Sequence, residues 1–162
     1  MRTGDLCFID DDFFDKVDDI NLKINYETTK RPHVVVFKEE GQDLYWVVPC
    51  SRKVDKYIGI VERKKSRGYD TRGILILDVA ELKGKTVLLF QDMFPIAKKY
   101  LTAYVRGDNE LYISNDEILD KITKTARYCY RRLLEGFWFS TTPPNVEKIR
   151  NMMLREVTRS DR

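Results

Sequence analysis

Two short apolar runs, joined by a charged connection that contains glycine, constrain the fold of this chain more than any other feature. The first run covers residues 33–37 (His-Val-Val-Val-Phe) and the second covers 44–48 (Leu-Tyr-Trp-Val-Val). The connection, residues 38–43, reads Lys-Glu-Glu-Gly-Gln-Asp. Two such runs separated by a polar, glycine-containing link are typical of an antiparallel β-hairpin.

Basic residues flank this hairpin on the outer side of both strands. Lys30 and Arg31 precede the first strand, and Pro32, which cannot donate to a ladder, suits its first position. The second strand runs into Pro-Cys-Ser-Arg-Lys, which ends at Ser51 and Lys53. Antiparallel pairing places the start of one strand beside the end of the other, so we expect a hydroxyl and several cations at one end of a sheet.

Length and composition favour a single soluble domain spanning residues 1–162, of which 43% are hydrophobic and 34% charged. No apolar run approaches the roughly 18 residues of a membrane span, and the N-terminus lacks the apolar region of a signal peptide. The three cysteines are widely spaced and the chain has one histidine. We therefore expect a cytoplasmic protein without disulfides, metal or cofactor, and without a membrane partner.

The charge is small overall but unevenly distributed. The net charge is +3, yet residues 52–72 hold eight basic residues against three acidic ones, and six aspartates gather in residues 10–19. A segregated basic stretch is the footprint of phosphate binding. A solvated surface loop explains the same charges equally well at this point.

Further strands and a short helix are predicted around the hairpin. We expect a strand at 6–9 and a helix at 11–20, whose buried stripe is Phe13, Phe14, Val17 and Ile20. Residues 21–29 are polar and irregular. Strands at 74–79 and 86–90 bring the number before residue 92 to five. Between them, residues 57–61 form a helical turn or a loop, and 64–72 form an exposed, mobile segment.

The C-terminal third is predicted to be helical. A helix capped by Ser114 and Asn115 extends to about Gly136, and a final helix starts at 142–144, Thr-Pro-Pro. One face of the long helix is apolar, and the other carries Arg127 and Arg131. The predicted fold class is α+β, with a small, strongly curved antiparallel sheet or barrel, helical insertions and C-terminal helices.

Several kinds of catalytic site find no support in these residues. A lone His33 beside a strand-opening proline suits neither a zinc site nor a serine-histidine-aspartate triad, and Ser51 lacks the glycines of a nucleophile elbow. No glycine-rich phosphate loop is present. What remains is a hydroxyl beside a thiol, flanked by cations, which suits stabilisation of a charged phosphorane during attack by an RNA's own 2′-hydroxyl.

The order of these motifs resembles a known family. Gly4-Asp5-Leu6, Arg31-Pro32 before the valine run, Val48-Pro49-Cys50-Ser51 and a later Phe-Pro-Ile element resemble toxin ribonucleases of the PemK/MazF (Kid-like) superfamily. The similarity is greater to its type III branch, the ToxN/AbiQ/CptN-like endoribonucleases, in which a Pro-x-Thr/Ser-Ser-x-Lys pattern follows the second long strand. The resemblance covers nearly the whole chain.

The resemblance implies an SH3-like barrel and metal-independent RNA cleavage that leaves a 2′,3′-cyclic phosphate and a 5′-hydroxyl. It also implies cellular or phage RNA substrates, and a toxin that acts in abortive infection. The implied partner is a repetitive, pseudoknotted antitoxin RNA, which the toxin processes and binds in a higher-order assembly.

The resemblance also assigns residue roles. It implies catalytic roles for Ser51, Lys53 and Arg31. Cys50 is a further catalytic candidate, because it stands where relatives often have threonine. The residues expected to contact RNA are Tyr26, Lys30, His33, Arg52, Lys56, Arg127 and Arg131.

Each of these residues also has a structural explanation. Ser51 would close a turn or cap a helix at Arg52, Arg31 would form a surface ion pair with Glu39 or Glu40, and Trp46 belongs in the core. Three functions therefore stay open: an RNA-inhibited endoribonuclease, a MazF-like toxin inhibited by a protein, and a non-catalytic RNA-binding module.

Overall fold

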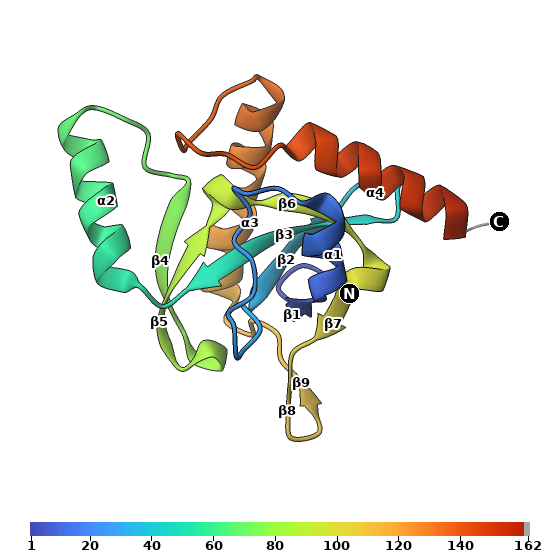
Figure 1. Ribbon diagram of the computed structural model, residues 1–162. Coiled ribbons are helices and arrows are strands. Elements are labelled where there is room, and N and C mark those ends of the chain that lie inside the picture. Colours follow the sequence, from blue (N-terminus) through green and yellow to red (C-terminus); the bar gives the residue numbers. More distant parts are fainter. Residues whose placement is uncertain (161–162) are drawn as a thin grey trace.

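The computed structural model describes residues 1–160, so the last two residues of the expected domain lie outside the described part. Its main sheet has the strand order β4-β5-β3-β2-β1-β7, and β6 pairs with β3 beside β5. All of its ladders are antiparallel. The strands are β1 (Leu6–Ile9), β2 (His33–Lys38), β3 (Leu44–Ser51), β4 (Ile74–Val79), β5 (Gly84–Leu89), β6 (Phe94–Ala97) and β7 (Leu101–Ala103). A small separate hairpin, β8 (Val105–Arg106) with β9 (Asn109–Glu110), projects from the body (Figure 1).

Strand β3 organises this sheet, because it pairs along both of its edges. One edge pairs with β2. The other pairs with β6 over Leu44–Val47 and with β5 at Cys50 and Ser51. The short 3-10 helix η2 (Phe90–Asp92) carries the chain from β5 to β6. Every residue of β3 is buried as a result.

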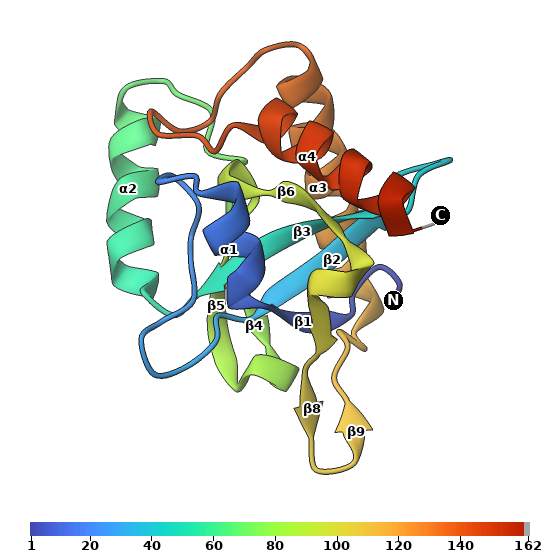
Figure 2. The same ribbon diagram turned by 45° about the vertical axis from the view of Figure 1, so that its right-hand side comes forward.

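Helices cover both faces of the sheet. Helix α3 (Asp116–Leu134) packs on the face that carries Trp46, Val48 and Cys50. Helices α1 (Asp11–Val17) and α4 (Val146–Ser160) pack on the opposite face, which carries Tyr45 and Val47. Helix α2 (Val54–Ser66) lies apart, against β4 and β5 (Figures 1 and 2). Among residues 1–160, no helix is both long enough and apolar enough to cross a membrane.

The sheet curls strongly without closing among the described residues. Strand β7 lies at one end of the strand order and β6 branches off β3, yet only the 3-10 helix η3 (Lys98–Tyr100) separates β6 from β7 in the chain. The predicted α+β class and antiparallel sheet are confirmed. No ladder within residues 1–160 closes the sheet, so the SH3-like barrel stays a prediction.

Most predicted elements are confirmed, and the corrections have local causes. The five early strands and the long helix are present, and the Asn115 side chain accepts a hydrogen bond from the Ile118 amide at 3.0 Å. Helix α1 ends at Val17, because Asp18 adopts a left-handed conformation (φ 49°), and Ile20 is consequently exposed rather than buried. Helix α4 begins at Val146, after the two prolines.

The largest correction concerns residues 54–66. The sequence suggested a turn or loop, followed by an exposed segment from residue 64, whereas α2 is a regular helix of 13 residues. Only Tyr57 on it is buried, so most of its surface faces solvent. Such a helix has a weak hydrophobic periodicity, which explains why the sequence pattern did not reveal it.

Candidate active site

The hairpin register brings the predicted catalytic residues together. His33 lies opposite Pro49 and Val34 opposite Val48, and the Cys50 amide donates to the Pro32 carbonyl at 3.0 Å. Arg31 therefore lies beside the end of β3. On the other edge of β3, Ser51 pairs with Val87 of β5.

A groove of about 580 Å³ opens at this end of β3. Six of the residues predicted from the sequence line it: Tyr26, Lys30, Cys50, Ser51, Arg52 and Lys53. The rest of the wall comes from other elements: Phe8, Thr29, Pro32, Leu82, Thr86 and Tyr104. The groove thus combines the hairpin end with residues that follow it by more than 30 positions.

Arg31 is fixed by several contacts at the edge of this groove. Its Nη1 donates to the Cys50 carbonyl at 2.9 Å and its Nε donates to the Ile24 carbonyl at 3.2 Å. Its guanidinium carbon lies 4.5 Å from the centre of the Tyr26 ring, within cation–π range. The expected surface pair with Glu39 or Glu40 is absent from residues 1–160, and Glu39 instead binds Arg150 and Trp46.

Ser51 and Lys53 lie at the junction of β3 and α2. The Ser51 side chain is 4% exposed, and its Oγ accepts a hydrogen bond from the Lys53 amide at 3.2 Å. This contact is the local turn role that the sequence also allowed. Lys53 directly precedes the first turn of α2, and its side chain is exposed. The positive end of the helix dipole therefore adds to the local cationic charge.

The other two cations in the groove have protein partners. The Arg52 Nη2 donates to the Leu82 carbonyl at 2.7 Å. Lys30 lies 3.2 Å from an Asp10 carboxylate oxygen, in an exposed pair of the kind that contributes little to stability. A phosphate entering the groove would therefore compete with Asp10 for Lys30.

Burial makes Cys50 a poor base or nucleophile. Its side chain is 3% exposed and packs among the apolar residues under α3. Burial raises the pKa of the Cys50 thiol to about 12, although the Arg31 charge acts in the opposite direction. The thiol is therefore protonated at neutral pH and does not supply the thiolate that covalent or base catalysis requires.

His33 is not available for the RNA contact that the sequence suggested. The side chain is fully buried, and its Nδ1 lies 3.0 Å from the Arg31 carbonyl oxygen. Burial lowers its pKa to about 3, so the ring is neutral at pH 7. This prediction is wrong, because His33 is the first residue of β2 and its ring packs inside the protein beside Phe94.

Three predicted RNA contacts lie outside the groove. Lys56 lines a second cleft, between α2 and the C-terminal end of α3. Arg127 and Arg131 are exposed on α3, and the Arg131 guanidinium carbon lies 5.9 Å from the Tyr128 ring centre.

Sequence reasoning did not identify the far wall of the groove. Thr86 and Leu82 come from β5 and the turn before it, and Tyr104 follows β7. The one available signal was Thr86, a buried hydroxyl residue that opens an otherwise apolar strand. Tyr104 had no such signal, because it depends on how β7 pairs with β1.

The groove can bind and stabilise a phosphate that carries extra negative charge. It brings the Ser51 hydroxyl close to several cations. Arg52 in its wall and Arg31 at its edge are held by backbone carbonyls. Fixed donors of this kind stabilise charge that develops in a transition state. Within residues 1–160, no group of three or more His, Cys, Asp or Glu side chains could hold a metal ion.

Known proteins resemble this chain in structure rather than in sequence. No protein-family model matches the sequence, and no curated protein matches it significantly. Among solved structures, AbiQ, a lactococcal anti-phage endoribonuclease of a type III toxin–antitoxin system, is similar with a TM-score of 0.65 and 14% identity, over 97% of each chain.

A second similar solved structure comes from a bacterial type III toxin–antitoxin system, in which a non-coding RNA pseudoknot selectively inhibits the toxin. Its TM-score is 0.67 at 16% identity, over 94% of this chain and 96% of that one. The chain therefore has the fold of type III toxin–antitoxin proteins, and the resemblance predicted from its motifs is confirmed at the level of the fold.

Proposed function

We propose that this protein is an endoribonuclease toxin that cleaves RNA in the groove at the end of β3. The observation that carries the proposal is the convergence of Ser51, Lys53, Lys30 and Arg52 on one groove, beside the clamped Arg31. The shared fold with AbiQ, an endoribonuclease, supports the same conclusion.

The proposed reaction uses the substrate's own 2′-hydroxyl. Its oxygen forms a bond to the adjacent phosphorus while the bond from phosphorus to the 5′-oxygen of the next nucleotide breaks. The 2′-hydroxyl loses its proton and the 5′-oxygen gains one, which leaves a 2′,3′-cyclic phosphate and a 5′-hydroxyl. The reaction consumes no water and requires no metal.

The residues of the groove divide this work between positioning and charge stabilisation. Ser51 aligns the 2′-hydroxyl or relays its proton. Lys53, whose side chain is exposed, is free to reach the phosphate and the leaving oxygen. Arg31 uses its Nε and Nη1 on backbone carbonyls, so its remaining N–H groups are held in a fixed direction for the phosphorane. Positioning and electrostatics supply most of the rate.

The proposal extends to how the toxin is controlled. We propose that a repetitive, pseudoknotted RNA, cut by the toxin and then retained in a higher-order assembly, inhibits the enzyme in the cytoplasm. The second structural neighbour, from a system with a pseudoknot inhibitor, supports this assignment. Exposed Arg127 and Arg131 on α3 are candidates for that contact, and cellular or phage RNAs are the substrates.

The test is to incubate purified protein with RNA in the presence of EDTA and to determine the chemistry of the product ends. We expect cyclic phosphate and 5′-hydroxyl ends, and their loss in Ser51→Ala. The matched control is Ser66→Ala, which removes an exposed hydroxyl from α2. RNA that is bound and left intact would contradict the enzyme and favour a binding module. Protein that purifies free of nucleic acid would count against an RNA inhibitor.

A further inference from the structure

A second cleft, larger than the catalytic groove, lies on the other side of α2. Its volume is about 880 Å³. Its walls are α2, the segment after α2, the C-terminal end of α3 and residues 137–142. In Figure 1 the segment after α3 extends toward the segment that follows α2, above the sheet. The proposed reaction uses none of this surface.

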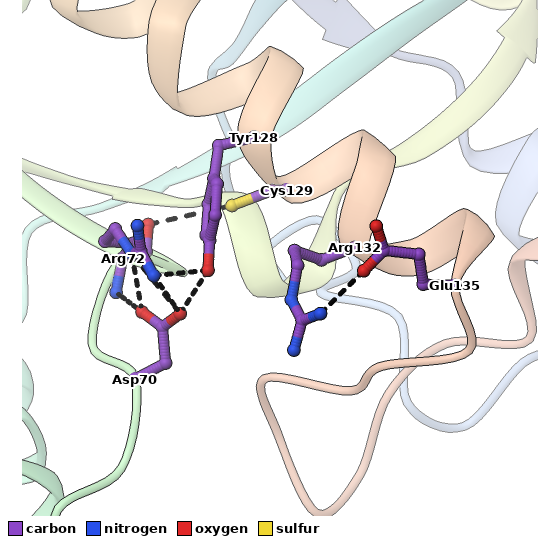
Figure 3. A network of polar contacts seen from close by, with 6 residues as sticks. All are labelled: Asp70, Arg72, Tyr128, Cys129, Arg132 and Glu135. Atoms are coloured by element: carbon purple, nitrogen blue, oxygen red, sulfur yellow. Dashed lines mark hydrogen bonds and ion pairs between the residues drawn. The ribbon is translucent and has the colours of Figure 1, made fainter.

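The charge of this cleft is strongly positive. Seven Lys and Arg residues line it against a single acid, Asp70. Asp70 is already engaged, because its Oδ2 accepts hydrogen bonds from Arg72 at 2.8 Å and from the Tyr128 hydroxyl at 2.6 Å (Figure 3). Arg132 is also paired, with Glu135 at 2.6 Å (Figure 3). Two of the seven cations are therefore compensated, and the cleft keeps a net positive surface.

Aromatic side chains alternate with these cations. Trp138 and Tyr69 are 68% and 63% exposed, which is unusual for side chains of this size. The Arg72 guanidinium carbon lies 3.6 Å from the centre of the Tyr128 ring, and that of Arg132 lies 4.2 Å from the centre of the Phe137 ring. Exposed rings and cations on one concave surface are the features with which proteins bind single-stranded nucleic acid.

The cleft and the catalytic groove are neighbours. Lys53 lines the groove, and Lys56, which lines the cleft, follows it by less than one helical turn, about 5 Å. One RNA strand can therefore pass from the groove across the first turn of α2 into the cleft.

We propose that this cleft binds the single-stranded stretch of the substrate that flanks the scissile phosphate. The cations hold its phosphates, and Trp138 and Tyr69 stack on its unpaired bases. The cleft thereby sets which RNAs are cut efficiently, whereas the groove performs the cleavage. The inference rests on the proposed ribonuclease function.

An acidic protein segment is the competing ligand for a cationic cleft. It would use the positive charge, but it gives no reason for large aromatic rings to remain exposed between the cations. Bases have a π-face and stack on such rings, so RNA accounts for both features of the surface.

The test compares two groups of variants in binding and in cleavage. Arg63→Ala/Arg67→Ala removes two exposed cations and Trp138→Ala removes one exposed ring. The matched control, Lys85→Ala/Lys148→Ala, removes two exposed cations that do not line the cleft. Binding is measured with an all-2′-deoxy strand, which cannot be cut, and kinetics with single-stranded RNAs of increasing flank length.

We expect Trp138→Ala to weaken binding of the deoxy strand roughly tenfold. Arg63→Ala/Arg67→Ala should lower the slope of log affinity against log salt by about 1.4, the value for two lost phosphate contacts on a single strand. Both should raise KM for RNAs with long flanks and leave KM for the shortest cleavable RNA and kcat unchanged. The control should match the wild type.

The outcomes separate this inference from the proposed function. If KM and the salt slope are unchanged in the cleft variants, the inference is overturned. Cleavage of RNA by those variants would still support the proposed ribonuclease function. If the wild type does not cleave RNA, the proposed ribonuclease function is overturned. Binding of the deoxy strand would still test whether the cleft binds single-stranded nucleic acid. A polyglutamate peptide that binds as tightly as the deoxy strand, and is insensitive to Trp138→Ala, would identify an acidic protein ligand and also overturn the inference.

Discussion

The groove at Ser51 and the cleft across α2 are both cationic, but they hold their charges differently. In the groove, Arg31 and Arg52 are tied to backbone carbonyls and Ser51 is almost fully buried. In the cleft, Arg63, Arg67 and the ring of Trp138 extend into solvent. Fixed charges suit a transition state, because they need no reorganisation when charge develops. Exposed ones suit a strand that varies in sequence and conformation.

The sharpest test of this difference compares two lysines about one helical turn apart. Lys53→Ala should lower kcat by about 100- to 1,000-fold with little change in KM, because we propose that its charge stabilises the phosphorane. Lys56→Ala, in the cleft, should raise KM and leave kcat unchanged. Single-turnover cleavage measures kcat and titration with the deoxy strand measures binding. Equal effects of both substitutions on kcat would contradict the proposed division between a catalytic groove and a binding cleft.

Asp92, a buried residue of η2, gives the next largest effect, which is on stability. Burial raises its pKa from 3.8 to about 6, although the charges of Lys23, Arg31 and Lys64 oppose this shift. Its Oδ2 is buried without a hydrogen-bond partner in the described structure. The stabilisation that protonated Asp92 provides is therefore complete below about pH 4 and is lost as the pH rises through about 6.

The substitution Asp92→Asn removes the ionisable carboxyl, so the loss of stability at higher pH should disappear. At pH 7.5 the variant should be more stable by about 3 kcal/mol, which corresponds to a Tm roughly 6–12 °C higher. The difference should shrink to near zero at pH 4, where the wild-type carboxyl is also neutral. Thermal unfolding at several pH values tests this expectation, and a difference independent of pH would show that the buried charge is not its cause.

Gly73 allows the cleft to be perturbed without a change of charge. A Cβ at this position would lie 2.9 Å from the Phe139 Cβ and 3.2 Å from the Gln91 Cβ. Gly73→Ala should therefore cost about 1–3 kcal/mol and displace the cleft wall. RNA binding should weaken while kcat is retained. Gly59→Ala, within α2, is the control and should stabilise the protein by about 0.5–1 kcal/mol.

The smallest expected effect concerns the geometry of Arg31 rather than its charge. Lysine retains the positive charge but cannot bind the Cys50 and Ile24 carbonyls together, as the guanidinium does. Arg31→Lys should cost about 1 kcal/mol of stability and reduce kcat, whereas Arg63→Lys in the cleft should change neither. Denaturant unfolding and cleavage rates measure the two effects. Full activity of Arg31→Lys would show that fixing the cation is unimportant.

The hairpin could be predicted because its signals are local. Strands that are covered on both faces have continuous apolar runs, so residues 33–37 and 44–48 and the connection between them predicted both strands and their antiparallel pairing. The irregularity in register between Val35 and Phe37 was not predicted. The pairing was enough to bring Arg31 to Cys50 and to place Ser51 and Lys53 in one groove.

The remainder depends on contacts between distant segments. Helix α2 buries little except Tyr57, so its pattern resembled a polar loop. His33 was expected to contact RNA, and only the packing against Phe94 shows that its ring points inward. The second cleft joins residues from before 60 to after 140, and no local pattern links them.

The double pairing of β3 has a consequence for synthesis of the protein. The hairpin that carries Arg31 and Ser51 leaves the ribosome early, but the groove wall also needs Leu82, Thr86 and Tyr104. Until those residues emerge, one edge of β3 has neither β5 nor β6 to pair with. Non-local pairing of this kind forms slowly. A nascent chain therefore carries its proposed catalytic residues well before the groove around them is complete.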